Sequence, residues 1–177
     1  MIRFCHCMRL ALLMGLAGCT GVPEGITPVQ NFELNRYLGK WYEIARLDHS
    51  FERGLERVTA EYSMREDGGV RVVNRGYSPD KKAWSEIEGK AYLVGVPNVG
   101  HLKVSFFGPF YSSYVVFDLD PEYSYAFVSG NSTSYLWLLS RTPNVSDELL
   151  ARFTTWAGEL GFDTEKLVYV VHDKDTK

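Results

Sequence analysis

The sequence predicts an all-β protein, an eight-stranded antiparallel up-and-down barrel with one C-terminal α-helix packed outside it and a short ninth strand. Short runs rich in Val, Tyr, Phe, Leu and Thr follow one another along the chain, and turn residues bound each run. One helical pattern near the C-terminus interrupts this succession. Closing the strands into a barrel removes the exposed edges of an open sheet. On this pattern alone, a β-sandwich is the alternative.

The strands are expected between local turn signals. Asp67-Gly68-Gly69 is typical of a tight turn between the second and third strands. Residues 102–106 alternate apolar and polar side chains, as a half-buried strand does. The expected strands lie near residues 41–48, 56–65, 70–78, 83–94, 101–107, 113–119, 124–130 and 135–141, and the ninth lies near 167–171.

One helix is expected at residues 147–160. Ser146 suits the N-cap, Asp147 suits the positive end of the helix, and Gly161 suits the stop. Residues 135–139 are apolar on both faces, so their outer side needs a cover that this helix can supply. The apolar stripe that would pack there consists of Leu149, Leu150, Phe153, Trp156, Ala157 and Leu160.

The N-terminus reads as an export signal. Arg3 and Arg9 precede an apolar run over residues 10–18, which is shorter than the roughly 20 residues that a membrane span needs. The run ends in Leu-Ala-Gly before Cys19, which resembles the lipobox of bacterial lipoproteins. The resemblance implies a signal peptide at 1–18 that is removed, and a diacylglycerol on the Cys19 thiol. An ordinary secretory signal that is cut elsewhere is the alternative.

The rest of the chain divides into a tether and one domain. Residues 19–33 carry Gly and Pro with little periodicity, so they read as a lipidated N-terminus and tether, and 34–177 form the barrel domain. Thr20, rather than Asp, follows the cysteine, which resembles enterobacterial lipoproteins sent to the outer membrane. The expected location is therefore the outer membrane, lipid-anchored and facing the periplasm.

Charge and cysteine content exclude several function classes. The formal net charge is −3 and no basic block stands out, so no nucleic-acid partner is expected. Two of the 3 cysteines, Cys5 and Cys7, lie in the signal. The Cys5-His6-Cys7 run looks like a metal motif, but a discarded segment holds no working site. The mature domain is therefore expected to have no disulfide, no cysteine nucleophile, no metal and no cofactor.

Three segments in order resemble the lipocalin family. Gly39 and Trp41 at the start of the first strand resemble its Gly-x-Trp signature. Asp118-Leu119-Asp120 with Tyr123 resembles its second conserved segment, and Arg141 resembles its third. The match covers nearly all of residues 34–171. With the lipobox in front, the chain resembles the bacterial outer-membrane lipoproteins of this family, close to the apolipoprotein D branch.

The resemblance implies structural roles for Gly39, Trp41 and Arg141. In lipocalins the tryptophan plugs the closed end of the barrel and the arginine lies across its ring, which is favourable by about 0.5–2 kcal/mol. The guanidinium can also donate to carbonyls at the barrel end. The second segment departs from the usual Thr-Asp-Tyr, because Pro121-Glu122-Tyr123 follows Asp120. The conformation of that turn is therefore left open.

Alternation along each strand predicts which side chains face the barrel interior. With Trp41 inward, Glu43, Ala45 and Leu47 are expected inward too. Small inward residues, namely Ala60, Gly89, Ala91 and Ala126, favour a cavity over a packed interior. The predicted ligand-binding residues are Ala60, Tyr62, Val72, Asn74, Ile87, Ala91, Leu102, Val104, Phe106, Tyr114, Val116, Tyr135 and Trp137.

The expected function is lipid binding at a membrane. An apolar cup with a few polar groups suits an acyl chain, and the resemblance implies fatty acids or lysophospholipids, stored or transferred in the cell envelope. Arg53, Arg57 and Arg75 are candidates by position for contacting a phosphate headgroup, although solvated surface charges are the more ordinary interpretation. His49 and His101 are interpreted as ordinary loop or strand residues.

Two other functions and one assembly are compatible with the sequence. A scaffold or interaction lipoprotein with a filled barrel is one alternative, and a lipid-modifying enzyme is the other. No Gly-x-Ser-x-Gly elbow, paired metal-ligand spacing or phosphate loop supports an enzyme. The isomerase type of enzymatic lipocalin needs a cavity thiol that this chain lacks. Pairing of two barrels into a homodimer through the open-end loops is left open.

Overall fold

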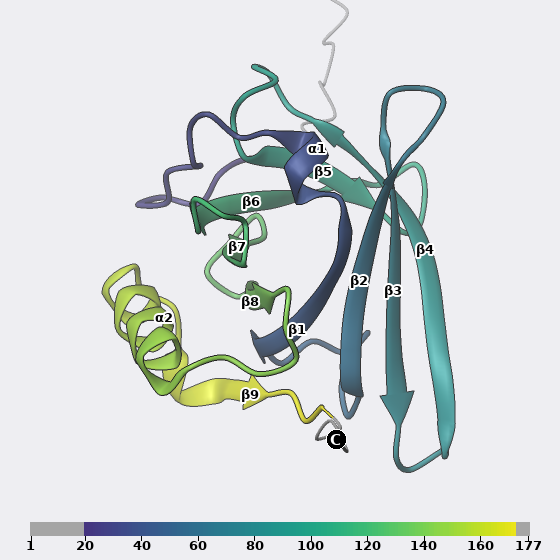
Figure 1. Cartoon of the computed structure of the whole chain (residues 1–177), viewed down its shortest axis with the longest axis vertical. Coiled ribbons are helices and arrows are strands. Elements are labelled where there is room, and N and C mark those ends of the chain that lie inside the picture. The colour runs from purple at the N-terminus through teal and green to yellow at the C-terminus, as the bar shows by residue number, and fades with distance from the viewer. Residues whose placement is uncertain (1–19, 173–177) are drawn as a thin grey trace, which may run out of the picture.

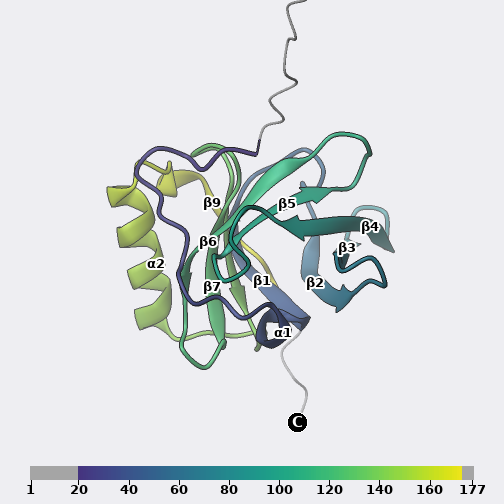
Figure 2. The same ribbon diagram turned by 90° about the horizontal axis from the view of Figure 1, so that it is seen from above.

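Eight antiparallel strands close into a barrel in the computed structural model, which describes residues 20–172 (Figures 1 and 2). β1 pairs with β2 through its first half and with β8 through its second, which closes the ring. β9 (Leu167–Tyr169) pairs with the end of β1 outside that ring. The eight barrel strands are β1 (Gly39–Leu47), β2 (Glu56–Met64), β3 (Val70–Ser78), β4 (Ala83–Leu93), β5 (His101–Ser105), β6 (Ser112–Leu119), β7 (Tyr125–Ser129) and β8 (Leu136–Ser140).

The predicted fold class is therefore confirmed, and the sandwich alternative is wrong. Each strand lies within two residues of its expected bounds. Two short helical turns were not expected: α1 (Leu34–Tyr37) across one end of the barrel, and η1 (Thr164–Lys166) before β9. Within the described residues, no helix is both long and apolar enough to span a membrane.

α2 (Asp147–Glu159) packs outside the barrel, as predicted (Figure 2). The Ser146 Oγ accepts a hydrogen bond from the Leu149 backbone N–H at 3.3 Å and caps the helix. Phe153 is fully buried, and its ring centroid lies 4.9 Å from that of Phe127 on β7. The outer face of β7 and β8 is thus covered by this apolar helix stripe, which explains why residues 135–139 are apolar on both faces.

The closed end of the barrel is built around Trp41 and Arg141. The Arg141 guanidinium carbon lies 3.8 Å from the centroid of the fully buried Trp41 ring. The same guanidinium donates to four backbone carbonyls, at 2.8 Å to Lys40, 2.8 Å to Arg36, 2.9 Å to Leu38 and 3.3 Å to Tyr123. One side chain therefore ties α1, the start of β1 and the β6–β7 turn together. Its position between them satisfies carbonyls that the end of a barrel leaves unpaired.

A glycine is needed at position 39 for this closure. The backbone of Gly39 has φ +91°, which L side chains rarely adopt. A Cβ there would also lie 3.5 Å from the Arg141 Nη1 atom. The sharp turn from α1 into β1 therefore depends on this residue.

The atypical β6–β7 turn is held by Asp120. Its Oδ2 atom accepts from the backbone N–H of Glu122 at 3.1 Å, and from both the N–H and the hydroxyl of Ser124, at 3.1 and 2.7 Å. Tyr123 adopts φ +60° within this turn, and its hydroxyl accepts from the Glu33 backbone N–H at 2.8 Å. The departure from the usual motif therefore still places a buried tyrosine against the closed end.

The segment before α1 packs along the barrel. Ile26 is buried with the residues between the barrel and α2, and Phe32 is buried at the closed end. The Val29 N–H donates to the Val116 carbonyl at 2.9 Å, and Gln30 forms a bridge with Val99. Residues 20–33, which the sequence presents as a tether, thus lie on the fold. Cys19 and the signal lie outside the described residues.

A β-bulge in β1 corrects one part of the predicted interior. The register with β8 shifts between Glu43 and Ala45. Beyond this point the alternation is inverted, so Ala45 and Leu47 pack in the outer core with α2 rather than inside the barrel. Arg46 takes the inward position instead and is 1% exposed. The expectation that Ala45 and Leu47 face inward is wrong because alternation assumes an unbroken strand.

We expect Arg141→Lys to lower the free energy of unfolding by about 2 kcal/mol, because a single ammonium cannot reach the carbonyls that the guanidinium fork satisfies. Urea unfolding followed by tryptophan fluorescence measures this loss. Arg71→Lys is the matched control, since Arg71 pairs with Glu88 at 2.6 Å on the exposed surface, and its unfolding curve should stay close to that of the parent. Equal losses in the two variants would contradict the assigned role.

Candidate functional site

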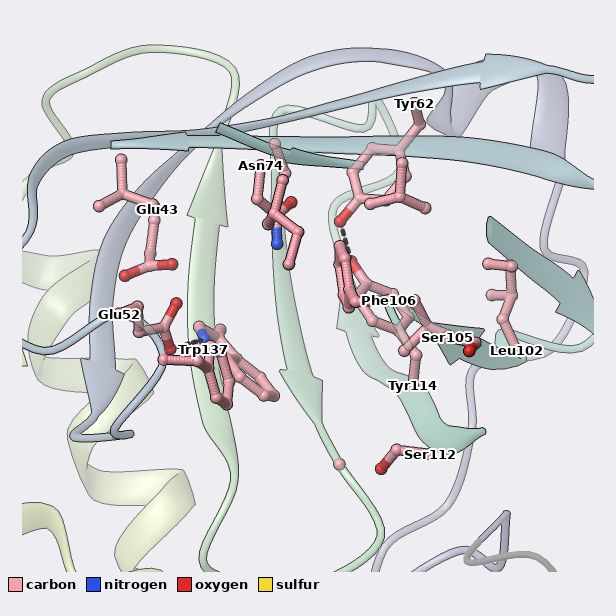
Figure 3. Close-up of a pocket in the computed structure, with 18 of the residues that line it drawn as sticks. Glu43, Glu52, Tyr62, Asn74, Leu102, Ser105, Phe106, Ser112, Tyr114 and Trp137 are labelled. Carbon is pink, nitrogen blue, oxygen red and sulfur yellow. Dashed lines mark hydrogen bonds between the residues drawn. The ribbon is translucent and has the colours of Figure 1, made fainter. Parts of the chain in front are cut away.

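The barrel is hollow. A cavity of about 550 Å³ extends from α1 at the closed end to the loops at the other end, which form the mouth (Figure 3). Of the thirteen side chains predicted to bind ligand, all but Val116 line it, namely Ala60, Tyr62, Val72, Asn74, Ile87, Ala91, Leu102, Val104, Phe106, Tyr114, Tyr135 and Trp137.

Val116 is the exception. Its side chain is fully buried, and it packs in the cluster of Phe32, Trp41 and Tyr123 that fills the closed end. β6 runs from the mouth toward that end, so a residue this far along the strand lies beneath the cavity floor. Of the predicted residues, Val116 is therefore the one that the structure places outside the cavity lining.

Two of the four small inward residues create the space. Ala60 and Ala91 line the cavity, whereas Ala126 is packed at the closed end. At Gly89 the room is occupied, because a Cβ there would lie 2.7 Å from the Phe106 ring. Gly89 therefore lets Phe106 lie against the wall and adds no volume of its own.

Aromatic side chains surround the mouth. Phe51 lies in the loop between β1 and β2, and Phe107 and Phe110 lie in the loop between β5 and β6; all three also line the cavity. Their exposed fractions are 61, 72 and 79%. Loop residues have no alternation to reveal their direction, so the sequence did not indicate these three.

A buried group of two acids and one base lies on the wall near the mouth. The Arg46 Nη1 atom donates to the Glu43 carboxylate at 2.7 Å, and its Nη2 atom donates to the Glu52 backbone carbonyl at 2.9 Å. The Glu52 carboxyl accepts from the Trp137 indole N–H at 3.0 Å and lies 4.0 Å from the Arg46 Nε atom (Figure 3). This Glu43–Arg46–Glu52 group therefore fixes the β1–β2 loop to the barrel interior.

The group has one carboxyl more than it has cations, and its burial favours a bound proton. The pKa of Glu52 is raised to about 9, first by burial and next by the nearby Glu43 carboxylate, against the attraction of Arg46. Burial also raises the pKa of Glu43, against the attraction of Arg46. At neutral pH the pair holds a proton, which leaves the group without net charge beside an apolar cavity.

Arg46 and Glu52 were missed from the sequence. Glu43 was expected inward, and Arg46 stands three residues later, which on a regular strand places it on the opposite face. One indication was present in the sequence: a carboxylate that faces the interior, as Glu43 was expected to, needs a cationic partner. A bulge between Glu43 and Arg46 would turn Arg46 inward and supply that partner. Glu52 lies in a loop, where no periodic pattern indicates burial.

The three candidate headgroup arginines are placed differently. Arg75 lines the cavity, with its guanidinium carbon 4.3 Å from the Trp84 ring centroid. Arg53 pairs with Asp48 at 2.6 Å, and Arg57 lies 4.8 Å from the Tyr77 ring centroid. Neither Arg53 nor Arg57 is among the described residues that line the cavity. His49 is buried and stacked on the cavity residue Tyr135, with 4.4 Å between ring centroids.

Hydroxyl groups gather at the inner end of the cavity. Tyr37 on α1, Tyr62 on β2 and Tyr114 on β6 all line it. The Tyr114 oxygen lies 2.7 Å from that of Tyr37 and 2.9 Å from that of Tyr62. Elsewhere the lining is mostly apolar. Among the described residues no cluster of His, Cys, Asp and Glu could hold a metal ion.

A barrel that is closed at one end and hollow behind an apolar mouth defines a binding protein for one small hydrophobic molecule. The comparison with known families agrees with this class. The chain belongs to the lipocalin family, since the model of the Lipocalin-like domain matches residues 32–172. Lipocalins are chiefly binding and transport proteins, and this agrees with the expectation that the chain is not an enzyme.

Similar proteins occur in bacteria and animals. The chain is 65% identical over 156 residues to Outer membrane lipoprotein Blc of Vibrio cholerae, covering 88% of this chain and 91% of that protein. It is 56% identical over 148 residues to the Escherichia coli K12 protein of the same name, covering 84% of each. Apolipoprotein D of Bos taurus is 34% identical over 176 residues, 89% of this chain and 92% of that one.

The fold is also found among solved structures. Insecticyanin from the tobacco hornworm Manduca sexta superposes with a TM-score of 0.67 at 20% identity, covering 87% of this chain and 88% of that one. At this identity the likeness shows the fold alone. It confirms the barrel architecture independently of the bacterial relatives.

We expect Glu52→Gln to change the pH dependence of stability. The folded protein binds more protons than the unfolded chain between the ordinary Glu pKa of 4.5 and the raised value of about 9. The free energy of unfolding of the parent protein should therefore fall as pH rises through this window. Glutamine stays neutral and keeps an acceptor for Trp137, so the variant should gain stability relative to the parent toward the upper pH limit.

Urea unfolding across this window measures the effect. Glu66→Gln is the control, because Glu66 is exposed in the turn between β2 and β3, and its curve should follow that of the parent. Parallel pH profiles for the parent and Glu52→Gln would show that Glu52 is ionised in the folded protein.

Proposed function

We propose that the protein is a membrane-anchored carrier that binds fatty acids or lysophospholipids and stores or transfers them in the bacterial cell envelope. The observation that carries this proposal is the apolar cavity of about 550 Å³, which lies within the range of sites for single small molecules. A cavity of this size argues against the scaffold alternative, which assumes that side chains fill the barrel.

The mouth supports a ligand with a polar end. The walls toward the closed end are mostly Val, Leu, Ala and Tyr, whereas Glu43, Glu52, Asn74 and Arg75 lie on the wall nearer the mouth. The Asn74 Oδ1 atom is buried without a hydrogen-bond partner among the described residues. An acyl chain with its headgroup toward the mouth would fill the apolar part and give these polar atoms partners.

The names of the relatives support the proposed location. Two of them, from Vibrio cholerae and Escherichia coli, are called outer membrane lipoproteins and cover most of this chain. Together with the Leu-Ala-Gly-Cys ending of the signal, this supports a lipid anchor at Cys19 and attachment to the outer membrane on the periplasmic side. Several acyl chains on one residue hold a protein at a bilayer far longer than one chain does.

We expect titration with a radiolabelled or fluorescent fatty acid to show saturable binding, and Ala60→Trp or Ala91→Trp to weaken it by roughly tenfold or more. An indole in the cavity displaces several methylene groups of the ligand, each worth about 0.8 kcal/mol. Glu61→Trp is the matched control, since Glu61 is the exposed neighbour of Ala60 on β2 and should leave affinity unchanged.

Circular dichroism would establish that all three tryptophan variants fold. Unchanged affinity in folded Ala60→Trp and Ala91→Trp proteins would place the ligand outside the barrel. Absence of binding to the parent protein, with fatty acids and lysophospholipids alike, would reject the proposed lipid carriage.

The anchor is tested separately by metabolic labelling with radioactive palmitate. We expect the full chain to be labelled and Cys19→Ser to be unlabelled, because the diacylglycerol is carried on that thiol. Cys5→Ser and Cys7→Ser lie in the signal and should leave labelling intact. Label retained in the Cys19→Ser protein would place the acylation elsewhere.

A further inference from the structure

The tyrosine hydroxyls at the inner end of the cavity form a group that headgroup binding at the mouth does not use. Tyr37, Tyr62 and Tyr114 meet from three separate elements, with Tyr114 in the middle of two hydrogen bonds of 2.7 and 2.9 Å. Figure 3 shows the Tyr62–Tyr114 bond facing the cavity, on the opposite side from Glu52 and Trp137. We refer to these three residues as the tyrosine trio.

The trio contains one hydroxyl hydrogen more than its own hydrogen bonds use. Each phenol has one hydrogen to donate and two lone pairs to accept with. Two bonds among three hydroxyls use two hydrogens, whichever direction each bond takes. The third hydrogen has no acceptor among the described residues. A buried donor that is left without a partner favours any ligand that supplies one.

The surroundings keep the trio protonated and in place. Burial raises the pKa of each of the three phenols well above its ordinary value, so each stays a donor. Tyr37 is held from below by Trp41, whose indole N–H donates to the Tyr37 carbonyl at 2.7 Å and whose ring centroid lies 4.7 Å from that of Tyr37. The side walls near the trio are apolar, with Val70, Val72 and Leu102.

We propose that the tyrosine trio is a binding subsite for an oxygen acceptor at the end of the lipid that enters the barrel first. The cavity then prefers single-chain lipids whose inner end carries a hydroxyl or carbonyl oxygen over chains that end in a methyl group. This inference rests on the proposed lipid binding and adds to it a second polar contact, at the inner end of the cavity away from the mouth. The oxygen has two chemical sources: an oxygenated tail, or the carboxyl of a fatty acid that binds head first.

The test is a set of matched titrations of the purified protein. The ligands are saturated fatty acids from decanoic to octadecanoic acid, their ω-hydroxy counterparts, and lysophosphatidylcholines of the same chain lengths. The proteins are the parent, Tyr62→Phe, and the triple variant Tyr37→Phe/Tyr62→Phe/Tyr114→Phe. The triple variant keeps all three rings and removes every hydroxyl, whereas Tyr62→Phe leaves two hydroxyls, one bond and still one unused hydrogen.

For an oxygenated tail, we expect the parent to bind the ω-hydroxy acid that reaches the trio roughly three- to tenfold tighter than the plain acid. Tyr62→Phe should keep this preference and the triple variant should lose it. For a carboxyl that binds head first, the triple variant should weaken the plain acids by a similar factor. The lysophosphatidylcholines, whose headgroup stays at the mouth, should be unaffected.

The inference would be overturned if the parent showed no ω-hydroxy preference at any chain length and the triple variant also bound the plain fatty acids as tightly as the parent does. A triple variant that binds every ligand as the parent does would also overturn it. Both outcomes differ from a failure of the proposed function, in which the parent binds no acyl chain at all. Thermal unfolding of the triple variant establishes that it is folded before its affinities are compared.

Discussion

The packing of Arg141 on Trp41 is the interaction on which the rest of the interior depends. It closes one end of the barrel, and through the Trp41 ring it supports Tyr37 and therefore the floor of the cavity. The same guanidinium joins α1 to the β6–β7 turn, two segments that lie far apart in the sequence. A barrel without this plug would be open at both ends. The cavity therefore has a single mouth because Arg141, stacked on Trp41 and hydrogen-bonded to backbone carbonyls, closes the other end.

The opposite end is organised by a different constraint, the bulge in β1. One extra residue turns Arg46 into the interior, where it binds the Glu43 carboxylate and the backbone of the β1–β2 loop. The loop therefore carries Phe51 and Glu52 to the cavity from a fixed position. A buried cation shared by two acids is costly unless its hydrogen bonds are nearly complete, and here two backbone carbonyls and a bound proton reduce that cost.

The sequence was sufficient for the architecture and for most of the cavity wall. Strand alternation, anchored on Trp41 and Arg141, placed Ala60, Val72 and Trp137 correctly because those strands are regular. It failed at Ala45 and Leu47, where a bulge with no glycine to mark it inverts the faces, and at Val116, where facing inward is not the same as reaching the cavity. Glu52 and the mouth phenylalanines lie in loops, whose direction depends on tertiary contacts that no local pattern encodes.

The packing of the chain from Val22 onward has a consequence for how far the barrel can travel. Val22 and Ile26 pack with the residues beneath α2, and the Thr20 backbone already contacts His101, so an anchor at Cys19, as proposed, would join the lipid to the folded body through almost no intervening chain. Under the proposed anchoring, so short a connection would keep the barrel close to the leaflet that holds the lipid. Exchange with another membrane would then require that membrane, or a soluble shuttle, to come to the protein.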